Sequence, residues 1–110
     1  MIIRIFVSPC DLEGMEEFYL SKALPILRKQ EGCLLAIAAK DKKSRPPKIA
    51  MISVWKNLSS LKRFTGRNYK NPKVVPEEKP LLLGNPLLQN LEIIRAVKKK
   101  DLRSLDQIML

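Results

Sequence analysis

The chain has 110 residues, 45% of them apolar, and its 21 basic and 11 acidic side chains give a formal charge of +10. This length and apolar fraction predict one globular domain and exclude a disordered chain. Histidine is absent, which excludes Ser-His and Cys-His nucleophile pairs, histidine-ligated haem and the usual histidine-containing zinc sites. With only two cysteines, a four-thiolate site is excluded as well, so we expect no metal.

The sequence also predicts where the protein resides. No apolar run approaches the roughly 20 residues of a membrane span, and residues 1–7 lack the basic start of a signal peptide. We therefore expect a soluble, cytoplasmic protein in which Cys10 and Cys33 are reduced.

The first half of the chain predicts a strand, a long helix and two further strands. Apolar and β-branched residues over 2–7 indicate a buried strand. Apolar residues at three- and four-residue steps then predict a helix up to Gly32, which Pro25 should kink near residues 21–24 without ending it. Residues 33–39 and 49–55 predict the next two strands, joined by a basic loop over 40–48.

The second half predicts a short helix, an irregular connection and a last strand. The helix carries Phe64, is capped by Asn57 or Ser59 and closes at Gly66. Residues 67–86 are rich in proline, with one turn of helix around 80–83, and residues 89–97 predict the fourth strand. We thus divide the chain into a domain, 1–97, and a basic linker with an amphipathic C-terminal helix, 98–110.

This β-α-β-β-α-β order predicts an α+β, ferredoxin-like sandwich with its helices on one face of an antiparallel sheet and a short helical tail. A strand in a sheet with one solvent-exposed face should alternate apolar and polar residues, because successive side chains point to opposite faces. Residues 33–39 and 49–55 are instead apolar on both faces. Two short helices cover only one face. A second copy of the same sheet is the simplest cover for the other, so we predict a homodimer through the sheet faces.

Several short motifs resemble the antibiotic-biosynthesis-monooxygenase-like family of dimeric α/β barrels. They are Glu-Gly-Cys-Leu at 31–34, the strand Ile49–Trp55 running into the helix at 56–64, and three leucines at 81–83. The resemblance spans about residues 1–97. It implies two sheets packed face to face in a dimeric α/β barrel, with a pocket in each subunit between sheet and helices.

The family includes cofactor-independent oxygenases of polyphenols and quinols, haem-degrading enzymes and proteins without an assigned reaction. The haem-degrading members use an asparagine on strand one, a tryptophan on helix two and a histidine. Here strand one offers only Arg4 and Ser8 as polar groups, Phe64 stands at the helix-two position, and histidine is absent. A haem oxygenase of that type is therefore not expected.

Four residues are candidate substrate-binding groups, and each also has a structural interpretation. Trp55 suits the wall of a pocket, yet a tryptophan at a strand end is more often an anchor between sheet and helix. Phe64 and Tyr69 offer stacking surface or, alternatively, core and loop packing. Asn57 suits a donor to a substrate oxygen or a helix cap. No pair of carboxylates stands out, and the catalytic residues stay unknown.

The positive charge is concentrated between residues 40 and 79, which carry twelve basic and three acidic side chains. We expect the loop at 40–48 and the connection after the second helix to meet at one end of the sheet. There the basic side chains would steer anions toward a pocket, or simply remain solvated. These anion-steering candidates are Lys42, Lys43, Arg45, Arg67 and Lys70.

Three classes of function stay open. The first is a cofactor-independent monooxygenase acting on a small electron-rich aromatic or quinol-like substrate, which needs no cofactor because the substrate itself reduces oxygen. The second is a non-catalytic dimer that binds or senses a small ligand. The third is a basic module that binds a polyanionic partner. Nucleic acid is not the expected partner, because Tyr69 is the only candidate in the basic segment for an aromatic ring that stacks on bases.

Overall fold

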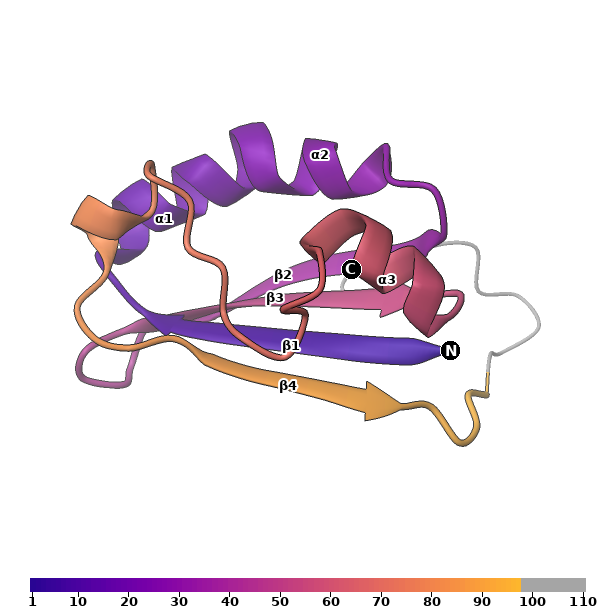
Figure 1. Ribbon diagram of the computed structural model, residues 1–110. Helices are drawn as coiled ribbons and strands as arrows, with labels where there is room; N and C mark the ends of the chain where they lie inside the picture. The colour runs from indigo at the N-terminus through magenta and orange to yellow at the C-terminus, as the bar shows by residue number, and fades with distance from the viewer. Residues whose placement is uncertain (98–110) are drawn as a thin grey trace.

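The computed structural model describes residues 1–97, so the predicted linker and tail helix at 98–110 lie outside the described residues. Four antiparallel strands form one sheet in the order β2-β3-β1-β4, and the helices cover one of its faces (Figure 1). The predicted α+β, ferredoxin-like fold is confirmed. In chain order the elements are β1 Ile2–Pro9, α1 Leu12–Phe18, the π-helical turn η1 Tyr19–Ala23, α2 Leu24–Arg28, β2 Cys33–Asp41, β3 Lys48–Trp55, α3 Leu58–Thr65, the 3-10 turn η2 Lys79–Leu81 and β4 Leu87–Glu92.

The long helix contains the predicted distortion near Pro25, which takes the form of a π turn. The segments α1, η1 and α2 follow one another without a break from Leu12 to Arg28. Proline has no N–H to bond to the preceding turn, and its ring crowds the carbonyl four residues back. The backbone widens just before it, where the N–H of Leu24 donates to the carbonyl oxygen of Tyr19, five residues earlier.

The N-cap residue Asn57 sets the start of the short helix α3. The Asn57 side chain accepts a hydrogen bond from the Ser60 backbone N–H at 2.9 Å and another from the Ser60 hydroxyl at 2.9 Å. Asn57 rather than Ser59 is therefore the N-cap. Gly66, at φ +85°, ends the helix in a conformation that favours glycine.

The fourth strand was predicted over 89–97, and its bounds were wrong. It runs from Leu87 to Glu92, because its partner in the described part of the chain is β1, whose first paired residue is Ile2 opposite Glu92. One more backbone bond, from Ile93 N to the Met1 carbonyl oxygen at 2.8 Å, ends the pairing. No strand within residues 1–97 pairs with residues 94–97.

The described helices cover only one of the two sheet faces, although the uncovered face is strongly apolar. On the helix-covered face, β1 and β3 bury every second residue. No helix lies on the opposite face in residues 1–97 (Figure 1). Gln89 is the one polar residue among the twelve that occupy this open face in three successive rows. The rows are Leu35, Val54, Ile3 and Leu91; Ile37, Ile52, Ile5 and Gln89; and Ala39, Ala50, Val7 and Leu87.

None of the helices within residues 1–97 combines the length and the apolarity that crossing a bilayer requires.

Candidate functional site

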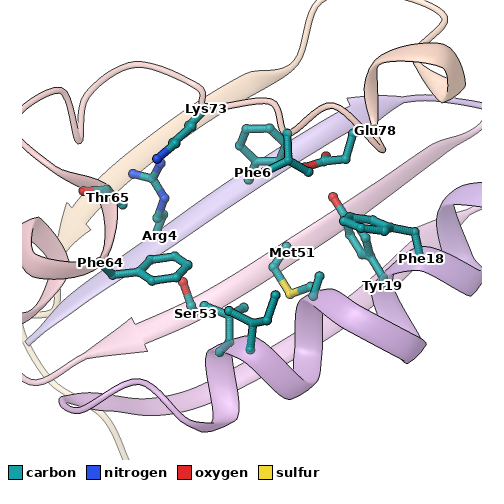
Figure 2. A pocket seen from close by; sticks show the side chains of 14 residues that line it. Arg4, Phe6, Phe18, Tyr19, Met51, Ser53, Phe64, Thr65, Lys73 and Glu78 are labelled. Carbon is teal, nitrogen blue, oxygen red and sulfur yellow. The ribbon is translucent and has the colours of Figure 1, made fainter.

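A cavity of about 270 Å³ lies between the helix-covered face of the sheet and the long helix. Figure 2 shows its lining side chains, which come from β1, β3, the long helix, α3 and the connection between α3 and β4. Most of its wall is apolar. The larger apolar groups that line it are Phe6, Phe18, Ile26, Leu27, Met51 and Phe64, and the polar ones are Arg4, Tyr19, Ser53, Thr65, Lys73 and Glu78.

Arg4 is a buried cation at one end of this cavity. It lies on the helix-covered face of β1 and is only 8% exposed. Its Nη1 donates to the Tyr69 carbonyl oxygen at 2.6 Å and to the Asn90 side-chain oxygen at 3.0 Å. Burial lowers the pKa of Arg4 from its ordinary value. Lys73, an exposed residue of the connection, lies beside Arg4 (Figure 2), so this end of the cavity is cationic.

Glu78 and Tyr19 form the other polar end (Figure 2). Glu78 is 7% exposed, and burial raises the pKa of its carboxyl group above the ordinary value. Burial and the charge of Glu78 also raise the pKa of Tyr19, so its hydroxyl keeps its proton and remains a hydrogen-bond donor. A carboxyl group with elevated basicity thus faces a neutral phenol inside a largely apolar cavity.

Two of the four candidate substrate-binding residues lie one behind the other at the cavity, with Phe64 on the wall and Trp55 behind it. Phe64 lines the cavity, whereas Trp55 is fully buried and stacks on it with ring centroids 5.2 Å apart. The indole Nε1 of Trp55 donates to the Ser53 hydroxyl at 2.9 Å, and Ser53 also lines the cavity. The structure therefore places Trp55 as support for two lining residues.

The other two candidate substrate-binding residues lie elsewhere. Asn57 is exposed and caps α3. Tyr69 belongs to the connection, and its carbonyl oxygen accepts from Arg4 and, at 3.1 Å, from the Asn90 side-chain amide. The Tyr69 ring lies near the ammonium groups of Lys62 and Lys70, 5.4 and 5.9 Å from its centroid. Of the four candidates, the structure brings together Trp55 and Phe64.

Sequence reasoning did not select the three polar groups that mark the cavity's ends. Arg4 carried a signal, because an arginine inside an apolar strand falls on the same parity as the buried Phe6 and Ser8. Tyr19 lay on the apolar side of the predicted helix and resembled core. Glu78 had no signal, because the connection that carries it has no periodicity from which burial could be inferred.

The basic segments do not meet at one end of the sheet, so that part of the prediction was wrong. Lys42, Lys43 and Arg45 lie in the loop after Asp41, whose strand ends level with Pro9. The Tyr69 carbonyl oxygen is bonded to Arg4, and Lys70 lies beside the Tyr69 ring. Arg4 is five residues from Pro9, which places this part of the connection about 17 Å along β1 from the end that carries the loop. Because α3 has only eight residues, the connection that carries Arg67 and Lys70 begins partway along the sheet.

The two cysteines lie at opposite ends of the sheet, as predicted. Cys33 begins β2 opposite Trp55, and Cys10 follows the far end of β1. Both thiols are free, and burial raises the pKa of each. Neither therefore has the depressed pKa of a reactive thiol.

The chain matches no protein-family model and no curated protein. Its similarities are to solved structures. A Deinococcus radiodurans protein named provisionally as an antibiotic biosynthesis monooxygenase has a TM-score of 0.67 at 18% identity, over 90% of this chain and 98% of the other. A structure named antibiotic biosynthesis monooxygenase has 0.66 at 14% identity, over 86% and 100%. Rv0793 of Mycobacterium tuberculosis has 0.66 at 12% identity, over 88% and 98%. The predicted resemblance is thus confirmed at the level of the fold, which this chain shares with proteins named antibiotic biosynthesis monooxygenases.

Proposed function

We propose that the protein is a cofactor-independent monooxygenase that oxidises a small, electron-rich aromatic or quinol-like substrate in the cavity beneath the long helix. The observation that carries the proposal is the pairing of Glu78, a buried carboxyl with a raised pKa, with the neutral Tyr19 hydroxyl at one end of an apolar cavity. The shared fold with proteins named antibiotic biosynthesis monooxygenases supports it.

The proposed reaction takes all its electrons from the substrate. A hydroquinone and O2 give a hydroxyquinone and water: one oxygen atom is inserted into a ring C–H bond as a hydroxyl group, and the other leaves as water with the hydrogens of the two hydroquinone hydroxyl groups. Deprotonation of a substrate hydroxyl comes first, because the phenolate transfers an electron to O2 more readily than the phenol. The carbon–oxygen bond then forms on the ring, and loss of water from the peroxide yields the quinone.

In this proposal Glu78 accepts the substrate proton and Tyr19 donates a hydrogen bond to the substrate oxygen. A carboxylate with a raised pKa is a stronger base than an exposed one, which suits proton removal from a phenol. Phe64, stacked on Trp55, presents a flat surface to the substrate ring. The apolar wall limits water around the anionic intermediate.

We further propose that two copies pack through their open sheet faces as a dimeric α/β barrel. The open face presents eleven apolar residues and Gln89 in three rows, and Leu35 and Leu91 at its rim are 45% and 49% exposed in the single chain. Burying such a face stabilises association at about 25 cal/mol per Å² of apolar surface removed from water, before the entropy of association is subtracted. The cavity lies on the opposite side of the sheet and stays open to a ligand.

Two alternative functions differ from this one in oxygen consumption and in the surface that binds the partner. A non-catalytic ligand-binding dimer would use the same cavity without consuming oxygen. A polyanion-binding module would need one continuous basic surface, whereas the loop at 42–45 and Lys70 lie about 17 Å apart along the sheet.

Oxygen uptake with a panel of hydroquinones and polyphenols tests the proposal. We expect turnover by the wild type and a loss of at least about tenfold in kcat/KM at pH 7 for Glu78→Gln. Glu77→Gln is the matched control, because Glu77 is the adjacent glutamate and is exposed. Ligand binding without oxygen uptake would replace the monooxygenase with the ligand-binding alternative, and equal losses in both variants would remove Glu78 from the proton-transfer role.

A further inference from the structure

We infer that the molecule bound in this cavity carries a carboxylate in addition to its phenolic ring, and that Arg4 binds that carboxylate. The reaction of such a molecule rests on the proposed function, whereas its binding does not. The substrate class is therefore a hydroxylated aromatic acid rather than a neutral quinol.

The first argument is that Arg4 is a buried charge for which residues 1–97 supply no counter-ion. Its side chain belongs to a residue only 8% exposed, and the ion pairs found within residues 1–97 are Lys40 with Glu16 and Arg63 with Glu31. Burial lowers the pKa of Arg4, and no carboxylate within residues 1–97 acts to raise it. Burying a charge without a partner is strongly unfavourable, and an anionic ligand would supply that partner.

The second argument is that the guanidinium has donors to spare. A guanidinium carries five N–H groups, and within residues 1–97 both hydrogen bonds of Arg4 leave from Nη1. Its Nε and Nη2 make no bond there. Neither nitrogen is fully buried. The Ser8 hydroxyl is the one side-chain polar atom in the described residues that is both buried and without a hydrogen-bond partner, and Nε and Nη2, which also lack a partner, are therefore accessible. The two nitrogens form the edge that binds a carboxylate in bidentate fashion.

The third argument is that Asn90, the side chain that accepts a hydrogen bond from Arg4, is uncharged. Asn90 lies opposite Arg4 in the β1–β4 pair and offers its guanidinium an amide oxygen at 3.0 Å. An aspartate at this position would neutralise the arginine within the chain. Asparagine orients the guanidinium and leaves its charge for a ligand.

The position of Arg4 in the cavity defines how such a ligand lies. Arg4 and Lys73 form the cationic end, and Glu78 with Tyr19 forms the end proposed for proton transfer (Figure 2). Phe64 and Met51 line the space between them. A molecule with a carboxylate at one end and a phenolic hydroxyl at the other matches this order of groups, with its ring along the apolar wall.

Calorimetric titration with 2,5-dihydroxybenzoate and its methyl ester tests the inference, because the two probes differ mainly in charge. We expect the wild type to bind the acid about 10- to 100-fold more tightly than the ester, as a charge-assisted hydrogen-bonded pair provides. In Arg4→Met the preference should fall to about unity while the ester's affinity changes little. Arg95→Met, which removes an exposed arginine, should keep the preference.

Asn90→Asp is the second variant, because it leaves Arg4 in place and supplies an internal carboxylate. We expect it to fold and to lose the preference for the acid, which a merely structural role of Arg4 would not predict. Equal wild-type affinities for acid and ester, binding of neither at millimolar concentration, or a preference that survives Asn90→Asp would each overturn the inference. If the acid binds as expected and no oxygen is consumed, the inference stands and the proposed monooxygenase falls.

Discussion

Trp55 lies directly behind Phe64, with the two rings 24° from parallel and their centroids 5.2 Å apart. The indole N–H is held by the Ser53 hydroxyl two residues earlier on the same face of β3. Phe64 and Ser53 line the cavity, and Trp55 holds both of them in place. The side chain that stands out most in the sequence therefore acts one layer behind the surface that a ligand would touch.

The variant Trp55→Phe tests whether Trp55 supports the cavity wall or contacts the ligand directly. The smaller ring retains aromatic packing against Phe64 and loses the bond to Ser53, so the free energy of unfolding should fall by about 1–3 kcal/mol in urea titration. Ligand affinity should change by less than about threefold, because Trp55 does not line the cavity. A variant of unchanged stability that has lost binding would show that Trp55 contacts the ligand after all.

Asn57→Ala removes the cap of α3. The side chain satisfies the Ser60 backbone N–H, and loss of such a cap lowers the free energy of unfolding by about 1 kcal/mol. Ser59→Ala is the matched control, because Ser59 is exposed and was the competing cap in the sequence; it should change stability by less than about 0.5 kcal/mol. Equal losses in thermal or urea unfolding would contradict the assignment of the cap.

Glu78→Gln should make stability less dependent on pH. Because burial raises the pKa of Glu78 in the folded chain, the folded state binds this proton more tightly than the unfolded state. Wild-type stability should therefore decrease as the pH rises above the ordinary value of 4.5 and through the raised pKa. The amide has no charge to bury, so its advantage over the wild type should grow over that interval in urea unfolding at several pH values. A constant difference between the two curves would show that the carboxyl is not perturbed.

Ile52→Lys tests the proposed dimer. Ile52 lies in the middle row of the open face, between Ile37 and Ile5, and a lysine there would place a charge at the centre of the proposed interface. We expect the wild type to be a dimer at micromolar concentration by light scattering and the variant a monomer. The control Ile94→Lys changes a residue that is 99% exposed and outside the sheet. A monomeric wild type would refute the proposed dimer.

The fold was largely predictable from the sequence because its signals are local. Strand apolarity, the cap at Asn57 and the proline in the long helix each act on near neighbours in the chain. The end of β4 was not predictable, since it depends on where β1 begins, some ninety residues away. Glu78 was missed for the same reason: its burial comes from elements packed over it, and nothing near it in the chain indicates this.

The π turn at Tyr19–Ala23 has a consequence for the wall of the cavity. Met15, Tyr19, Ala23 and Leu27 recur at steps of four residues, and the last three line the cavity. In a regular α-helix each such step advances about 40° beyond a full turn, so the stripe would drift around the helix. The wider turn takes up part of that drift and keeps the stripe in phase with the sheet. Deleting one residue from Tyr19–Ala23 would restore ordinary α-helical hydrogen bonding and leave Leu27 on the cavity side, because a π turn contains one residue more than the α-helical turn that it replaces.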